Sequence, residues 1–132
     1  MTEQMIYHQA IKLPYRYTAG EANTAFLNGL VERRILAGKC ATCDITVAPL
    51  GPFCTQCGTP LEGPIEVGPA GVVTTWTTDG QGRTFARIRL DGADTDILHR
   101  IDGEVSVGTR VEPVWAEDRE PEITAITTFT AA

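Results

Sequence analysis

The four cysteines of this chain are the feature that most restricts how it can fold. They form two C-x-x-C pairs, Cys40 with Cys43 and Cys54 with Cys57, separated by ten residues in "CATCDITVAPLGPFCTQC". Each C-x-x-C turn directs two sulfurs and some backbone amides at one point, and four thiolates complete a tetrahedral zinc site. The spacing therefore predicts one structural Zn²⁺ per chain.

Other uses of these cysteines stay open on the sequence alone. A rubredoxin-like iron site takes the same ligands, and disulfides would require an oxidising compartment. Thioredoxin-like redox chemistry uses a C-x-x-C that opens a helix in a βαβ unit, and neither pair has that context. A catalytic zinc needs an open coordination position, commonly with a histidine, whereas His8 and His99 lie far from both pairs. A closed zinc site is the interpretation we take forward.

Composition narrows the possible partners. The chain has 132 residues, enough for one domain or one domain with a small appendage, and a net charge of −6. An acidic chain is poorly suited to duplex DNA or an anionic membrane surface. The N-terminus lacks the pattern of a signal peptide, and no apolar run is long enough to cross a bilayer. We expect a cytoplasmic protein without a membrane partner, and nucleic acid is a minor hypothesis.

The region before the cysteines is expected to contain an extended arm and one helix. Thr18 and Glu21 stand in the S/T-x-x-E relation of a capping box, and apolar residues then recur at helical spacing to about Arg33. The apolar face could pack on the ribbon of the same chain. A single amphipathic helix on so small a body also suits a subunit interface, for which the candidate residues are Phe26, Leu27 and Leu30.

Short strands are expected on both sides of the cysteine pairs. The segment "RILAGKC" is expected to lead into the first pair as a short strand. After the second pair, the Gly- and Pro-rich segment 59–71 is expected to be a connector. From Gly71 onward five short segments rich in β-branched residues follow one another, which predicts a small antiparallel barrel or sandwich. The expected domains are an arm and helix over 1–37, a ribbon over 38–62 and a barrel over 63–132.

The order of these parts resembles the DUF35 family. The matching segments are the helix in "PYRYTAGEANTAFLNGL", the ribbon with "CATC" and "CTQC", the Gly/Pro connector, and the strands "GVVTTWTT", "FARIRLDG" and "VSVGTRVEPVW". The resemblance runs from about Leu13 to Phe129 and implies a mainly β fold: an N-terminal helix, a rubredoxin-like zinc ribbon and a C-terminal five-stranded OB-fold barrel. The chain departs from the family pattern at Asp44, where a glycine is usual, and at Pro49, where a double proline is frequent.

The resemblance also implies a partner. DUF35 proteins are small subunits of thiolase-superfamily assemblies, which include thiolases, steroid side-chain aldolases and acyltransferases. In these assemblies the large subunit carries the catalytic residues, and the DUF35 subunit helps shape the channel for CoA or the acyl chain. We expect a thiolase-like catalytic subunit as the partner, with a CoA thioester at the shared interface.

The residues agree with a non-catalytic role. Claisen or thiolytic chemistry needs an activated cysteine and a base, and the zinc site would use every cysteine here. The sequence contains no G-x-S-x-G, H-E-x-x-H or Walker motif. Two alternatives remain: a free-standing nucleic-acid-binding zinc-ribbon and OB module, and a small redox or metal-storage protein.

One strand carries the candidate ligand contacts. In "RTFARIRLD", alternation directs Ala86, Ile88 and Leu90 inward and places three other side chains on the outer face. The second and third strands of an OB-fold commonly carry the ligand surface, so arginines beside an aromatic suit a CoA phosphate, an adenine or an acidic partner. The alternative interpretation is that these side chains only form the solvent-exposed face of the strand, which gives the same alternation. The candidate contacts are Phe85, Arg87 and Arg89.

Overall fold

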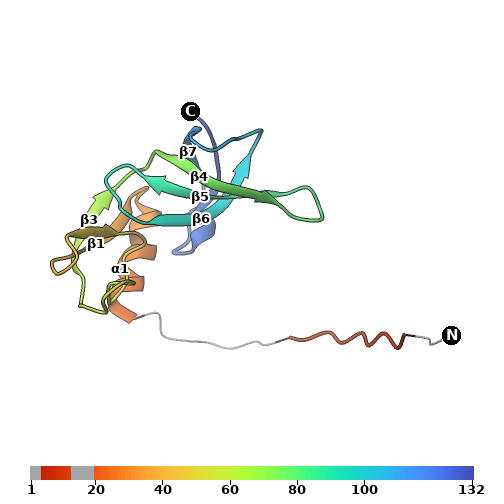
Figure 1. Cartoon of the computed structure of the whole chain (residues 1–132), viewed down its shortest axis with the longest axis horizontal. Helices are drawn as coiled ribbons and strands as arrows, with labels where there is room; N and C mark the ends of the chain where they lie inside the picture. Colours follow the sequence, from red (N-terminus) through yellow and green to blue (C-terminus); the bar gives the residue numbers. More distant parts are fainter. Residues whose placement is uncertain (1–3, 13–19) are drawn as a thin grey trace.

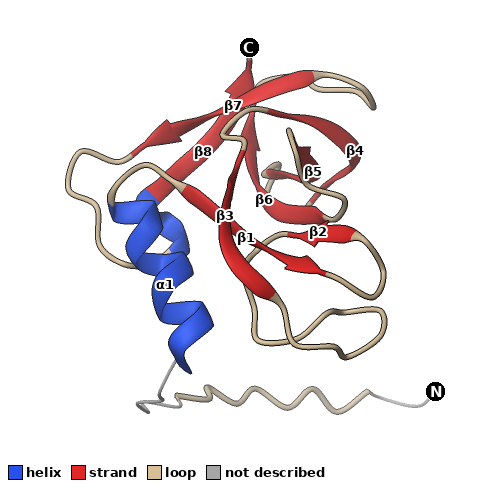
Figure 2. Ribbon diagram, turned by 90° about the vertical axis from the view of Figure 1, so that its left-hand side faces the viewer, coloured by secondary structure: helices blue, strands red, loops and turns tan. Residues whose placement is uncertain are grey.

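The computed structural model describes residues 4–12 and 20–132, and it places a helix and a small sheet against a β-barrel (Figures 1 and 2). Residues 4–12 are exposed chain outside any helix or strand. The elements are α1 (Gly20–Val31), β1 (Ile35–Cys40), β2 (Ile45–Val47), β3 (Glu62–Val67), β4 (Gly71–Thr78), β5 (Thr84–Leu90), β6 (Asp96–Asp102), β7 (Arg110–Trp115), the 3-10 helix η1 (Ile123–Ala125) and β8 (Ile126–Ala131). Within the described residues, no helix is both long and apolar enough to cross a bilayer.

Helix α1 ends two residues before the predicted limit. The amide of Arg34 donates to the carbonyl of Gly29 at 2.8 Å, and the amide of Arg33 donates to that of Leu30 at 3.1 Å. These are the two bonds of a Schellman motif, with Arg33 in the left-handed conformation at φ 61°. The end of the helix was not predicted from the sequence because the left-handed position of this motif usually carries glycine, and here it carries Arg33. The predicted capping residue Thr18 lies outside the described residues.

The small sheet has the order β2-β1-β3, with both pairs antiparallel. Strand β1 confirms the predicted extended entry into Cys40. The expectation that 59–71 is an irregular connector is wrong for residues 62–67, which form β3. Pro64 masks the strand in the sequence, and it lies where the pairing register with β1 shifts, a place where a sheet tolerates proline. The sheet crosses both predicted domain boundaries, which stay predictions.

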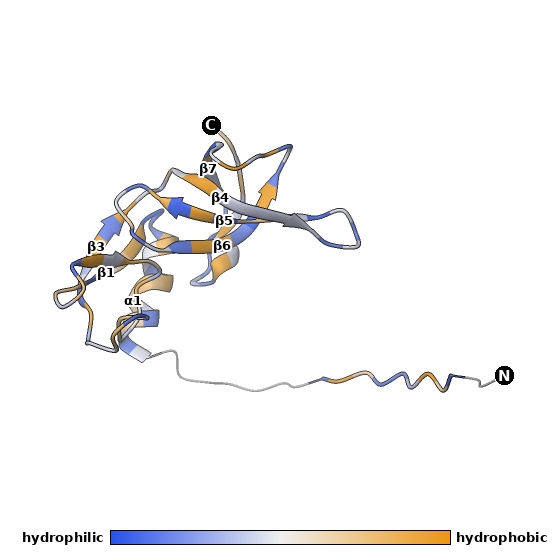
Figure 3. Cartoon of the chain, in the orientation of Figure 1, coloured by the Kyte–Doolittle hydropathy of each residue, from blue (hydrophilic) through white to orange (hydrophobic). Residues whose placement is uncertain are grey.

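The barrel is closed in the order β4-β5-β6-β8-β7 and has an OB-like topology. All five predicted strands are present, although the last begins as η1. The expectation of purely antiparallel pairing is wrong at one place, since β6 and β8 pair in parallel. Hydrophilic and hydrophobic residues alternate along β5 and β6 (Figure 3). The predicted class, mainly β with one helix, a ribbon and a five-stranded barrel, is confirmed.

Helix, sheet and barrel share one hydrophobic core. Leu30 of α1, Ile35 of β1 and Phe129 of β8 belong to the same cluster of buried side chains. Gly29 allows the close approach of α1 to β1, because a Cβ there would lie 3.1 Å from the Leu36 side chain. Arg119, from the segment between β7 and η1, donates to the Val31 carbonyl at 2.7 Å. The helix is therefore held by the barrel as well as by the sheet.

The loop between β5 and β6 joins the barrel to the ribbon. The Thr46 amide donates to the Asp94 carboxylate at 2.8 Å, and the Asp94 amide donates to the Thr46 carbonyl at 2.8 Å. The Thr95 hydroxyl accepts from the Ala48 amide and donates to the Ala48 carbonyl, each at 2.9 Å. These four bonds fix the ribbon's position against the barrel.

Replacing Thr95 with valine tests this junction. Valine keeps the shape of threonine but has no hydroxyl. The backbone amide and carbonyl of the buried Ala48 would therefore both lose their hydrogen bond to residue 95. We expect the free energy of unfolding to fall by about 1–3 kcal/mol, measured by urea denaturation. Thr75→Val, at an exposed position of β4, is the matched control. An equal effect of the two substitutions would contradict this role for the junction.

Candidate functional site

The four cysteines meet at the tip of the small sheet. Cys40 ends β1, Cys43 lies in the turn before β2, and Cys54 and Cys57 lie in the loop that leads to β3. All four are free thiols, and their sulfur atoms lie within 4.8 Å of one another. A tetrahedral ion with metal–sulfur bonds of about 2.3 Å needs sulfurs about 3.8 Å apart. The cluster has the ligand number, ligand type and spacing to hold one metal ion.

In each of the two turns, one backbone amide approaches the sulfur of the first cysteine of the pair. The Cys43 amide lies 3.3 Å from the Cys40 sulfur, and the Gln56 amide lies 3.4 Å from the Cys54 sulfur. Directly after each pair the chain turns through positive φ, at Asp44 (φ 55°) and at Gly58 (φ 76°). Gly58 adopts this conformation without a steric penalty because it has no Cβ. Asp44 tolerates it in place of the usual glycine, and its carboxylate pairs with Lys39 at 2.9 Å.

The crowded thiols differ in acidity. Hydrogen bonding with the hydroxyl and backbone of Thr59 lowers the pKa of Cys57 to about 6. The hydrogen bond with the Cys57 sulfur, followed by burial, raises the pKa of Cys43 to about 12. Without a cation, the raised pKa of Cys43 keeps that thiol protonated at neutral pH. A divalent ion supplies the charge that permits four thiolates, so the donor set fits a metal.

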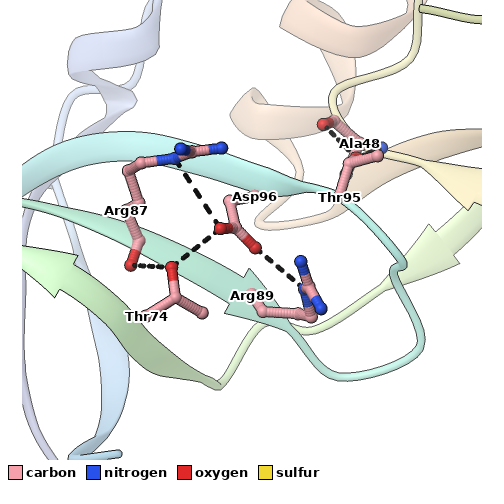
Figure 4. Close-up of polar contacts among 6 residues, drawn as sticks. All are labelled: Ala48, Thr74, Arg87, Arg89, Thr95 and Asp96. Atoms are coloured by element: carbon pink, nitrogen blue, oxygen red, sulfur yellow. Dashed lines mark hydrogen bonds and ion pairs between the residues drawn. The ribbon is translucent and has the colours of Figure 1, made fainter. Parts of the chain in front are cut away.

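The predicted arginines surround a nearly buried carboxylate (Figure 4). Asp96, whose side chain is 6% exposed, accepts from Arg89 Nε at 2.8 Å and from the Thr74 hydroxyl at 2.7 Å. Arg87 Nε lies 3.7 Å from the same carboxylate. Both arginines meet Asp96 through Nε. Asp96 therefore orients both arginines.

Arg87 and Arg89 line a cleft of about 610 Å³ between the barrel and the ribbon. Its ribbon side is formed by the loop that joins the two cysteine pairs, including Pro49 and the exposed ring of Phe53. Asp94 and Asp96 also line the cleft. The Asp94 carboxylate accepts a hydrogen bond from the Thr46 amide, and the Asp96 carboxylate pairs with the arginines. The lining therefore combines two exposed arginines with the exposed Asp94 and the nearly buried Asp96.

Phe85 does not share this cleft. It lies on the outer face of β5 as predicted, half-buried, with the Arg83 guanidinium 6.0 Å from the centre of its ring. It lines a different hollow with Leu98 and His99. His99 is nearly buried, and its ring nitrogens lie 3.2 and 3.3 Å from backbone carbonyls. The structure thus separates the candidate contacts into two sites.

The helix residues proposed as an interface are mostly internal. Phe26 is 6% exposed and Leu30 is fully buried, and both pack in the core shared with the barrel. This burial corrects the expectation for these two side chains, which have no surface to offer a partner. Leu27 is half-buried and packs at the edge of the core. An interface on the helix, which stays a prediction, would have to use Leu27 and its exposed neighbours.

The residues that organise the cleft were not predicted from the sequence. Asp96 and Thr74 came from separate strands with no motif to link them, and only the strand register brings them together. Thr59, which supports the Cys57 sulfur, sits two residues after the second pair. Its position so close to a predicted metal ligand was the one sequence signal that could have identified Thr59.

Comparisons with known proteins agree with this architecture. The chain matches no protein-family model and none of the curated proteins. Among solved structures, it is similar to a DUF35-family protein of unknown function from Sulfolobus solfataricus, with a TM-score of 0.63 and 22% identity over 82% of this chain and 83% of that one. It is also similar to the Ltp2-ChsH2(DUF35) aldolase, with a TM-score of 0.61 and 20% identity over 88% of this chain and 98% of that one. This chain has the DUF35 fold, with a four-cysteine cluster where a zinc ribbon would hold its metal.

Proposed function

We propose that this protein is a non-catalytic, zinc-binding subunit of an acyl-CoA enzyme complex of the thiolase, aldolase or acyltransferase type. The observation that carries the proposal is the convergence of all four sulfurs on one closed site. A zinc ion held by four thiolates has no free position for substrate and serves the structure of the ribbon. The nucleophile that such chemistry requires would then come from another chain.

The fold supports a partner of this class. One structural neighbour is described as a DUF35 component of an aldolase. The present chain has the same fold, and it offers a cleft beside its four-cysteine cluster that is lined by two exposed arginines. We propose that Arg87 and Arg89 face the anionic groups of a CoA thioester there, while the catalytic subunit closes the cleft. A cytoplasmic location fits both the thiolate ligands and a CoA substrate.

Association is the first test of this function. The chain should be co-expressed with the thiolase-like subunits of its own genome, and complexes should be resolved by size-exclusion chromatography with light scattering. We expect a stable complex with one of them that contains both chains and retains one zinc per copy of this chain. Migration of the metal-loaded chain alone in every combination would contradict the proposal.

A further inference from the structure

The outer side of β6 carries an apolar hollow bordered by arginine. The hollow has a volume of about 370 Å³ and is separate from the arginine cleft beside the ribbon. At its rim, Leu98 is 67% exposed in the middle of a strand, and Ile123 of η1 is 45% exposed. We call this surface the β6 face and define it by Phe85, Leu98, Arg100, Ile123 and Thr127.

The strand register builds this surface. Phe85 lies opposite Arg100, and Arg87 lies opposite Leu98, so apolar and cationic side chains alternate across the two strands. Arg100 is exposed, and it forms no ion pair with any residue of 4–12 or 20–132. The nearby carboxylate of Glu122 accepts a hydrogen bond from the Thr124 hydroxyl at 3.1 Å. Arg100 therefore places a positive charge without an ion-pair partner, among the described residues, at the border of the hollow.

The floor of the hollow is rigid. His99 contributes to the lining, and its ring packs edge-on against the buried ring of Phe129 at 5.3 Å between centres. Its two ring nitrogens lie 3.2 Å from the Arg100 carbonyl and 3.3 Å from the Ile123 carbonyl. The histidine therefore anchors the two sides of the hollow to each other, so the hollow is preformed for a binding partner.

The chemistry of the β6 face favours a protein over a nucleic acid. Oligonucleotides bind OB-folds by stacking bases on exposed aromatic rings along a basic groove. Here the most exposed large side chains are aliphatic, the Phe85 ring is flanked by Arg83, and the whole chain has a net charge of −6. An exposed aliphatic centre with arginine at its rim is typical of protein interfaces.

We propose that the β6 face is the docking surface for the catalytic subunit, and that the partner's contact carries an apolar side chain flanked by carboxylates. This inference rests on the proposed function and adds the surface and the chemistry of the contact. Arg87 opposite Leu98 lines the neighbouring cleft. A subunit seated on the β6 face would therefore extend directly over the cleft proposed for CoA.

Substitution of Leu98 by aspartate tests the docking surface. Val107→Asp is the matched control, because Val107 is 68% exposed and lies outside the β6 face. The probe is the purified thiolase-like subunit that associates with the wild-type chain, with affinity measured by calorimetry. We expect Leu98→Asp and Arg100→Glu each to weaken binding at least tenfold, and Val107→Asp to leave it within twofold. Zinc content and melting temperature should stay unchanged in all three, since the side chains are exposed.

The outcomes separate the two proposals. Full-strength binding by Leu98→Asp and Arg100→Glu would overturn the docking surface and leave the proposed function standing. If the wild-type chain binds no thiolase-like subunit, the proposed function fails and this inference fails with it. Salt-dependent binding of oligo-dT that is lost in Arg100→Glu would assign the β6 face to nucleic acid instead. Selective photo-crosslinking of the catalytic subunit from position 98, and not from 107, would support the proposal directly.

Discussion

Cys54→Ser is expected to lower the metal content from one ion per chain to nearly none. Cys54 is 4% exposed and packs with Cys40 and Val47 in the small hydrophobic cluster of the ribbon. Serine keeps the size of the side chain but provides a poor ligand for a soft, closed site. Structural zinc contributes about 10–16 kcal/mol of apparent binding energy in zinc-finger peptides, so loss of one ligand should release most of this stabilisation.

The damage should be local to the ribbon. The barrel, α1 and β1 share a core that does not include the cysteine cluster. The turns of the two cysteine pairs, residues 41–44 and 55–60, should therefore become sensitive to protease while the barrel keeps its β-sheet circular dichroism. Thr55→Ser, an exposed change in the same loop, is the control that should retain the metal. Metal analysis by mass spectrometry decides the result: a fully loaded Cys54→Ser protein would contradict the closed four-sulfur site, and iron in the wild type would replace zinc as its occupant.

Phe129→Ala should produce the largest loss of stability in the barrel. Phe129 is fully buried on β8, which lies between β6 and β7 and completes the barrel. Its ring also supports His99. Removing a buried phenylalanine typically costs about 3–5 kcal/mol, from lost burial and from the cavity that remains. For a domain of this size we expect a decrease in melting temperature of about 10–20 °C.

The chain provides a matched control for this substitution. Phe53 is 58% exposed, so Phe53→Ala removes the same atoms at little cost, within about 0.5 kcal/mol. Thermal and urea unfolding of both variants measure the difference. Similar stabilities of the two variants would show that β8 does not close the barrel as described.

Patterns local in sequence predicted much of this structure. The two C-x-x-C pairs predicted the cysteine cluster because a metal knuckle is built within a few residues of each pair. Alternation along 84–90 predicted which side chains of β5 face inward, since a strand has a strict period of two. The resemblance to DUF35 supplied the order of helix, ribbon and barrel.

The features that were missed depend on contacts between distant segments. Asp96 orients Arg87 and Arg89 only because β5 and β6 pair in one register. Phe26 and Leu30 are buried because α1 packs on the barrel as well as on the ribbon, and an amphipathic pattern does not identify what covers its apolar face. Strand β3 was hidden by Pro64, whose effect depends on lying at an irregular, edge position.

The most direct test of the central claim is the distribution of acyl-CoA cleavage or condensation activity between the subunits. The zinc-loaded chain, the thiolase-like subunit and their complex should be assayed at equal concentrations on the same thioester. We expect no turnover from this chain alone and the highest turnover from the complex, because all four sulfurs of the chain are held in the metal site. Turnover by the isolated chain at the rate of the complex would contradict the account.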